Sequence, residues 1–161
     1  MEKTTESAHN FFEKGLRLLQ ADDCHNAISL LSIAIDLDSY FAEAYQFRGI
    51  AYFSLHSYQR ALDDYQTALS LDPSLDKAYF FRALYFIHFK LYGEAIKDLT
   101  SAIELDKYFA EAYFYRGICK GMLDDENGGT YDIKAAASLG LKEAQKKLNE
   151  EGIVWYTMVR Y

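Results

Sequence analysis

The sequence has little of the residues that interrupt helices or cross-link chains. Its 161 residues include one proline, nine glycines, two cysteines and one tryptophan. So little proline agrees with helices joined by short turns. No apolar run approaches the roughly 18 residues that a membrane-spanning helix needs. Residues 1–12 also lack the apolar core of a secretory signal peptide. We therefore predict a cytoplasmic protein that has no membrane partner.

The chain also lacks an excess of positive charge. It carries 17 basic and 24 acidic side chains, which gives a formal net charge of −7. A protein that binds nucleic acid without regard to sequence needs a basic surface, so we predict no nucleic-acid partner. An acidic chain more readily meets a neutral or basic partner. Half of the residues are hydrophobic and 16% are aromatic, which favours an ordered interior over disorder.

No pattern of catalytic or metal-ligating residues stands out. The run 22–25 holds two Asp, a Cys and a His, but consecutive residues in one turn cannot all face one ion. The run 124–129 is similar to the start of a calcium loop, yet the twelfth position is Ala135, where a bidentate carboxylate is required. No histidine has a Ser or Cys at a motif spacing. We predict no metal, no cofactor and no catalytic residues, and keep an enzyme only as a last alternative.

What the sequence does contain is a repeat of 34 residues without insertion or deletion. Four units cover residues 8–41, 42–75, 76–109 and 110–143. Superposing them aligns residue types in columns. Small residues at three columns let two helices approach closely, and larger ones fill the space beside them. An aromatic column holds Phe11, Tyr45, Tyr79 and Tyr113. Three small columns hold Gly15, Gly49, Ala83 and Gly117; Ala27, Ala61, Ala95 and Gly129; and Ala34, Ala68, Ala102 and Ala136. A bulky column, between the last two small ones, holds Leu31, Tyr65, Leu99 and Ile133.

This period and these columns resemble the tetratricopeptide repeat family, over roughly residues 8–140. The resemblance implies an all-α fold, a right-handed superhelix of four helical hairpins with a C-terminal capping helix. Two features depart from the family pattern: the proline that commonly ends the second helix occurs only as Pro73, and the fourth unit has Gly128 and Gly129 where its second helix should start. The ending over residues 135–148 is similar to the related Sel1-type repeat.

Two charged columns lie 16 residues apart in the last three units. Arginine precedes the small column, and aspartate follows in the second half of the unit. A charged residue in a packed seam is normally paired, so we predict ion pairs within each hairpin, with solvated surface charges as the alternative. Such pairs are structural and not catalytic: Arg48 with Asp64, Arg82 with Asp98, and Arg116 with Asp132.

Turn residues and apolar spacing give the expected helix boundaries. Residues 1–7 form a polar lead, with Ser7 as a candidate cap. The first two hairpins use helices 8–20, 24–37, 42–55 and 58–71, and the third uses 76–90 and 92–105. In the fourth hairpin the first helix spans 110–122, and a longer, flexible turn precedes a helix over 130–138. These hairpins and the final helix form a single domain over residues 1–151.

The end of the chain differs in kind from the repeats. We expect a final helix over residues 141–151, with a polar outer face and an apolar inner one that covers the last hairpin. Residues 152–161 are apolar, aromatic and rich in β-branched side chains, so they are unsuited to contact with water alone. Three placements are open for this tail: packed on the end of the solenoid, folded into the groove, or in contact with another copy.

The resemblance also implies which residues are available for binding. First helices of tetratricopeptide hairpins line the concave face, and here that face is unusually apolar. Family members that grip acidic chaperone C-termini use Lys, Asn and Arg there, but the matching positions hold Phe12, Leu16, Phe47 and Phe81, with Lys77 the one match. We predict no such carboxylate clamp. The candidate groove residues are Phe12, Leu16, Leu19, Gln46, Ile50, Phe53, Lys77, Phe80, Leu84, Ile87, Glu111, Phe114 and Ile118, and the alternative role for each is stacking between neighbouring helices.

The preferred function is a scaffold or adaptor that binds a protein or peptide in an apolar groove without catalysis. A second hypothesis is a self-associating assembly unit that uses residues 153–161 as its contact surface, which would make the protein a homo-oligomer.

Overall fold

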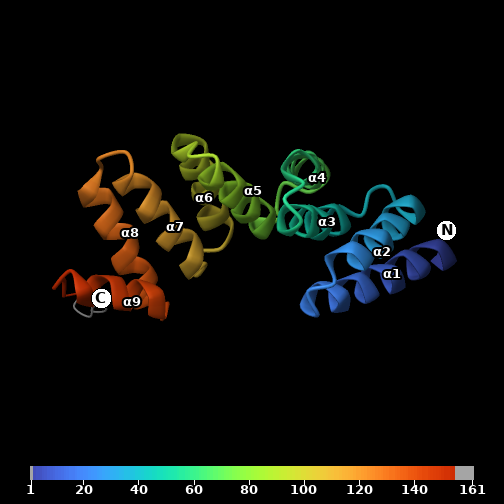
Figure 1. Cartoon of the computed structure of the whole chain (residues 1–161), viewed down its shortest axis with the longest axis horizontal. Coiled ribbons are helices and arrows are strands. Elements are labelled where there is room, and N and C mark those ends of the chain that lie inside the picture. Colours follow the sequence, from blue (N-terminus) through green and yellow to red (C-terminus); the bar gives the residue numbers. More distant parts are fainter. Residues whose placement is uncertain (1, 155–161) are drawn as a thin grey trace. The chain divides into compact units, whose positions relative to one another are not determined.

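The computed structural model describes residues 2–154, with side chains from residue 7 onward, and this part of the chain contains nine helices and no strands. Figure 1 shows the helices following one another along the chain. Their bounds are α1 Glu2–Gln20, α2 Cys24–Leu37, α3 Ala42–Ser54, α4 Tyr58–Leu71, α5 Asp76–His88, α6 Tyr92–Leu105, α7 Ala110–Gly121, α8 Glu126–Ser138 and α9 Lys142–Glu150. None of these helices combines the length and the hydropathy that crossing a bilayer requires.

The predicted boundaries are confirmed for the second helices of the first three hairpins, and first helices α3, α5 and α7 end within two residues of their predicted ends. The boundary of α1 is a correction. The segment 2–7, expected as a polar lead, continues the helix toward the N-terminus, and Ser7 lies inside it rather than at its cap. No proline or glycine stands between residues 2 and 14 to end the helix.

The start of α8 is a second correction. The helix begins at Glu126, four residues before the expected start, and Gly128 and Gly129 lie within its first turns. Asp125 caps the helix, because its side chain accepts a hydrogen bond from the Gly128 backbone N–H at 2.9 Å. A capped terminus stabilises the first turn despite the poor helix propensity of glycine. The turn before α8 therefore spans only residues 122–125, one residue more than the turns of the other hairpins.

The same backbone device closes all four hairpins. Two or three residues after the end of the first helix, the backbone is left-handed, with φ of 61° at Asp22, 58° at His56, 59° at Lys90 and 63° at Asp124. In each turn the following residue donates its N–H to a carbonyl five positions earlier, as in Asp23 to Leu18 at 2.8 Å. This is the hydrogen bond that closes a Schellman turn. The hairpins thus share one turn geometry although none of these four positions is a glycine.

Aspartate residues redirect the chain between the hairpins, and a proline follows only the second of them. Asp38, Asp72 and Asp106 end the second helices in extended conformations. Each side chain accepts a hydrogen bond from the backbone N–H two residues later, at 3.0, 2.8 and 2.8 Å. Such Asx turns redirect the chain without proline. One proline is therefore enough for the whole repeat.

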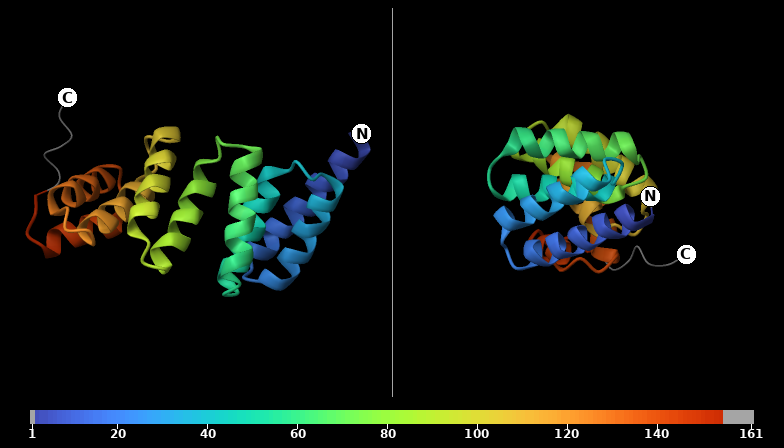
Figure 2. Two further views of the ribbon diagram at one scale, coloured as in Figure 1. Left: turned by 90° about the horizontal axis from the view of Figure 1, so that it is seen from above. Right: turned by 90° about the vertical axis from the view of Figure 1, so that its right-hand side faces the viewer.

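The molecule consists of two compact units, one that ends at Phe81 and one that begins at Arg82. The boundary falls inside α5, so the third hairpin contributes to both. Within each unit the two helices of a hairpin are antiparallel neighbours, and the first helix of the next hairpin packs on the second helix of the one before. Figure 2 shows the antiparallel pairs α1–α2 and α7–α8 from two further directions. The single domain predicted from the sequence stays a prediction.

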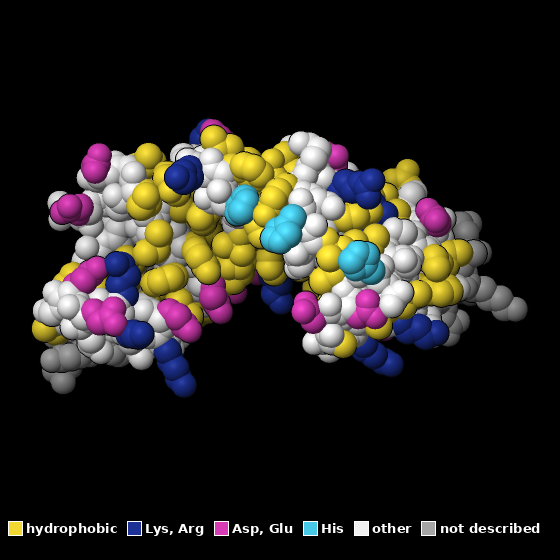
Figure 3. Space-filling model, viewed as in Figure 1, with side chains coloured by type: hydrophobic (Ala, Val, Ile, Leu, Met, Phe, Trp, Pro, Cys, Tyr) yellow, Lys and Arg dark blue, Asp and Glu magenta, His cyan; other side chains and the backbone are white. Residues whose placement is uncertain are grey.

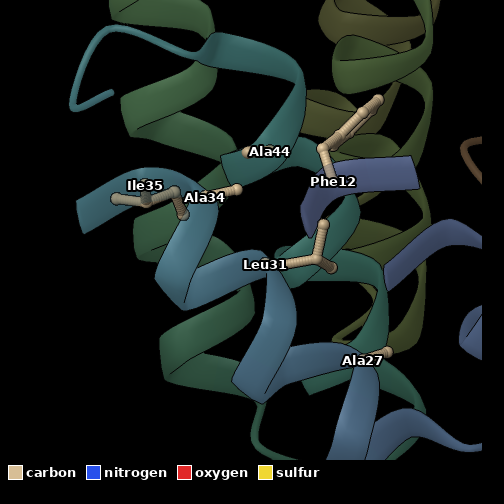
Figure 4. Packing of buried hydrophobic residues seen from close by; sticks show 6 residues of the cluster. All are labelled: Phe12, Ala27, Leu31, Ala34, Ile35 and Ala44. Atoms are coloured by element: carbon tan, nitrogen blue, oxygen red, sulfur yellow. The ribbon is translucent and has the colours of Figure 1, made fainter. Parts of the chain in front are cut away.

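Small and bulky columns of the repeat form the core, as their spacing predicts. In the first unit Ala27, Leu31 and Ala34 of α2 are fully buried, between Phe12 of α1 and Ala44 of α3. Figure 4 shows these side chains from the three helices close together. Gly49 is needed at the α3–α4 crossing, because a Cβ there would lie 2.6 Å from Cε1 of Tyr65. The close approach fixes the spacing of the two helices.

The second unit repeats this arrangement at its C-terminal end. Ile133, Ala136 and Ala137 of α8 are buried against Ala144 and Leu148 of α9. The helix α9 therefore covers the edge of the fourth hairpin, which is the place predicted for a capping helix. It is one residue shorter at each end than expected. Of the predicted tail, residues 155–161 lie outside the described part of the chain.

Candidate functional site

The predicted groove residues all lie on the first helices α1, α3, α5 and α7, but three of them are buried. Phe12 is 7% exposed, Gln46 is 2% exposed and Phe80 is 8% exposed. Side chains this deep stabilise the fold and have little surface left for a guest. The role of all thirteen residues in binding stays a prediction, and it is strongest for the members that reach the surface.

An aromatic cluster explains the burial of Phe12. Its ring lies 4.6 Å from that of Phe41 and 5.7 Å, edge-on, from that of Phe47. The exposed His9 stacks on Phe41 with ring centroids 6.1 Å apart. Aromatic pairs at these separations and tilts are attractive. The cluster ties α1 to the start of α3, so this part of the first-helix face is occupied by the protein's own side chains.

The remaining apolar members reach the surface in pairs one helical turn apart. All are half-buried. Figure 3 shows hydrophobic side chains exposed on the face in view, where α5 to α7 lie. Lys77 and Glu111 are exposed and add charge at the N-terminal ends of α5 and α7. The first unit contributes Leu16, Leu19, Ile50 and Phe53, and the second contributes Leu84, Ile87, Phe114 and Ile118.

The structure brings each predicted arginine to its aspartate. The Arg48 guanidinium donates from Nε and Nη2 to the two oxygens of Asp64 at 2.9 and 2.8 Å. Arg82 binds Asp98 at 2.7 and 2.8 Å. Arg116 binds Asp132 at 2.8 Å through both oxygens. These bidentate pairs cross from the first to the second helix of one hairpin and fix its register.

A further set of contacts, missed in the sequence, extends these pairs to the preceding hairpin. Nη1 of Arg48 donates to the hydroxyl of Ser32 on α2 at 3.0 Å, and Nη1 of Arg116 donates to the hydroxyl of Thr100 on α6 at 3.2 Å. Both hydroxyl residues lie 16 positions before their arginine. A Ser or Thr 16 positions before the arginine was the sequence signal that could have predicted these contacts. Each of these arginines thus holds two hairpins together.

Burial and pairing make these groups unsuited to catalysis. Asp132 is fully buried, and Lys120 approaches its second oxygen at 2.8 Å in addition to Arg116. The hydrogen bond to Asp132 raises the pKa of Arg116, and the hydrogen bond to Asp64 raises the pKa of Arg48. Cations held this way keep their protons, and both oxygens of each aspartate partner already accept a hydrogen bond. Their chemistry is structural.

The other residues singled out in the sequence serve turns and packing. Asp23 caps α2, accepting hydrogen bonds from the backbone and side-chain amides of Asn26 at 3.3 and 2.7 Å. Cys24 and Cys119 are buried free thiols. Burial raises the pKa of Cys119 to about 11, which disfavours the reactive thiolate. Within the described range 2–154, no group of three His, Cys, Asp or Glu side chains is arranged to hold a metal ion.

Comparison with known proteins agrees with this geometry. Residues 42–75, which form α3 and α4, match the family model of the tetratricopeptide repeat. This segment is a tetratricopeptide repeat. The other hairpins share features with residues 42–75: the left-handed turn between the two helices, the small residues where the helices cross, or the Arg–Asp ion pair. No curated protein matches the sequence.

Solved tetratricopeptide structures share the fold. MamA is 24% identical, with 86% of this chain and 81% of that chain covered and a TM-score of 0.76. PilF of Pseudomonas aeruginosa is 18% identical, with coverage of 92% and 72% and a TM-score of 0.79. The first tetratricopeptide domain of Spaghetti (RPAP3), solved with the HSP90 peptide SRMEEVD, is 27% identical, with coverage of 74% and 95% and a TM-score of 0.71. The likeness shows an all-α helical-repeat fold and carries no support for a Sel1-type ending.

Proposed function

We propose that this chain is a non-catalytic protein-interaction module that binds a peptide or a partner helix on the apolar face of its first helices. The observation that carries the proposal is the set of half-buried apolar pairs on those helices. Leu16 and Leu19, Ile50 and Phe53, and Leu84 and Ile87 are three positions apart, and Phe114 and Ile118 are four apart. Such spacing presents both members on one side of a helix.

Each unit on its own offers four such side chains, on neighbouring turns of its first helices. A partner helix commonly buries anchors at intervals of three, four and seven residues in an apolar groove. The solved complex of the Spaghetti (RPAP3) domain with an HSP90 peptide supports peptide binding by this type of fold. The polar and paired residues of the hairpin seams take no part, because the protein's own charges already satisfy them.

The chemistry of the partner follows from the charge and the apolar surface. The net charge of −7 disfavours an acidic guest. Phe47, Phe81 and Leu16 supply no cation for a carboxylate. The expected ligand is a neutral or basic peptide with hydrophobic anchors, and the acidic peptide SRMEEVD serves as a negative control.

Two matched pairs of variants test the proposal. A peptide is first selected against the immobilised protein from a random display library, and its affinity is measured by fluorescence anisotropy. Ile50→Glu in the first unit and Leu84→Glu in the second place a charge on the first-helix face. At least one of them should weaken binding about tenfold or more, which is about 1.4 kcal/mol.

The controls place the same charge on second helices. Ile33 of α2 and Leu105 of α6 are 38% and 46% exposed, so glutamate there meets water without disturbing a core. Ile33→Glu and Leu105→Glu should bind as the wild type does, and circular dichroism should show equal helix content for all four variants. Equal affinity of the first-helix variants and the wild type would refute the proposal. Phe80 is unsuitable for this test, since its burial makes unfolding the expected result of a charge.

A further inference from the structure

The fourth hairpin and α9 together enclose a cavity. It has a volume of about 510 Å³ and lies between α7, α8 and the end of α9. Its lining is largely apolar and rich in glycine, and Lys147 and Glu151, paired at 2.7 Å, lie at its side. The volume falls within the range of about 300–1,000 Å³ that is typical of ligand cavities. The main lining residues are Gly117, Ile118, Gly121, Gly129, Ile133 and Ile153.

A missing side chain is one reason for this space. Position 121 belongs to the repeat column that holds Leu19, Phe53 and Ile87 in the first three hairpins. In the fourth hairpin the column holds Gly121, and a Cβ there would meet no atom within 4 Å. The bulky apolar group that three hairpins supply from their own first helix is therefore absent here.

A short helix is the second reason. The helix α9 has 9 residues, whereas α7 has 12 and α5 has 13. It stops at Glu150, and Gly152 turns the chain with φ of +69°. One further helical turn spans about 5.4 Å. Had α9 continued for that turn, its residues would have extended along the cavity.

We propose that residues 155–161 of the same chain fill this cavity, with the side chain of Trp155 as the anchor. Ile153 lines the cavity, donates its N–H to the carbonyl of Leu148 at 2.8 Å, and packs against the buried cluster of α8 and α9. Trp155 follows two residues later, within about 7 Å of extended chain. Aromatic side chains bury about 150–250 Å² each, so an indole ring suits a space of this size.

The composition of the segment fits the cavity and its rim. Residues 155–161 read WYTMVRY, with Arg160 their one charged side chain. The rim has the opposite sign at Glu126, which is exposed and lines the cavity. Docking would remove apolar and aromatic surface from water and would complete the cap that α9 begins. The inference concerns the end of the fold and does not depend on peptide binding by the first helices, although docking would cover Ile118, one of the eight apolar side chains counted for that binding.

Trp155 is the sole tryptophan of the chain, so its fluorescence reports the docking directly. In the folded wild type its emission should be blue-shifted relative to the urea-unfolded protein and protected from acrylamide. Gly121→Leu restores the residue type of the column and fills the cavity. Trp155 emission should then move to the unfolded position, and acrylamide quenching should rise severalfold. Gly121→Phe is a second filling variant with the same expected outcome.

Gly93→Leu is the matched control. A Cβ at Gly93 also meets no atom within 4 Å, but this residue lies on α6 and does not line the cavity. Its fluorescence should equal that of the wild type, and circular dichroism should show that all variants are folded. A wild-type emission at the unfolded position overturns the proposal, and so does a blue shift that both filling variants retain. A blue shift that disappears on dilution, together with a dimer in light scattering, would assign the cavity to the segment of a second copy and overturn docking within one chain.

Discussion

The glycine at the crossing of α7 and α8 gives the sharpest prediction about stability. A Cβ at Gly117 would lie 2.7 Å from the backbone oxygen of Gly129 and 2.7 Å from Cγ1 of Ile133. The second distance is roughly 0.8 Å shorter than the contact distance of about 3.5 Å between carbon atoms. Because one obstacle is backbone, rotation of a side chain cannot relieve both clashes, and the two helices must separate.

The expected cost follows from two opposing effects. Overpacking a well-packed crossing typically costs about 1–3 kcal/mol. Replacing glycine by alanine inside a helix returns up to about 1 kcal/mol. Gly117→Ala should therefore lower the free energy of unfolding by about 1–2 kcal/mol. Urea denaturation followed by circular dichroism measures this change.

Gly93→Ala is the control for the effect of alanine alone. Its Cβ meets no neighbour within 4 Å, so the substitution should raise the free energy of unfolding by about 0.5 kcal/mol. The two Gly→Ala changes should thus have opposite signs. A stabilised Gly117→Ala variant would refute the argument that the crossing is too close for a methyl group.

Three further predictions concern the turns and a buried thiol. Lys90→Gly should raise the free energy of unfolding in urea by about 0.5–1 kcal/mol, because φ of 59° strains any residue with a side chain; a destabilised variant would contradict this. Hydrogen bonds from the Ser74 side chain and backbone lower the pKa of Asp72 in the folded protein. The contribution of Asp72 to stability is therefore complete above its ordinary pKa of about 3.9, and it is lost as the pH falls through the lower pKa of the folded protein. The difference in unfolding free energy between wild type and Asp72→Ala should stay constant from pH 7 to about pH 5 and shrink below about pH 4, and a difference that grows there would be the wrong sign. With its pKa raised to about 11, Cys119 should have about one thiol in a thousand ionised at pH 8, so it should react with an alkylating reagent much more slowly in the folded than in the unfolded protein.

The repeat could be predicted from sequence because its physics is local and periodic. A small residue every 34 positions, beside a bulky one, has a single simple explanation in a close helix crossing, and Gly49 against Tyr65 shows that crossing. The pairs Arg48–Asp64 and Arg116–Asp132 could also be predicted, because arginine and aspartate recur at a constant spacing of 16 in three units. Regular columns carry information that one copy alone would not.

The sequence predictions were wrong where a specific contact outweighs the helix propensity of a residue. Gly128 and Gly129 were placed in a flexible turn because glycine disfavours helices, but the cap by Asp125 and the tight crossing of Gly129 over Gly117 hold them in α8. The left-handed residues at positions 22, 56, 90 and 124 are two aspartates, a histidine and a lysine, so no column of one residue type revealed them. The burial of Phe12, Gln46 and Phe80 depends on how α1, α3 and α5 pack in three dimensions, which periodicity does not specify.

Binding by the first helices is the central claim, and an amide chemical-shift map tests it most directly. The isotope-labelled full chain is titrated with the peptide selected by display, and each backbone amide is followed. The account predicts that the largest shifts fall on α1, α3, α5 and α7, around residues such as Ile50 and Leu84. Largest shifts on α2, α4, α6 and α8 instead would contradict it.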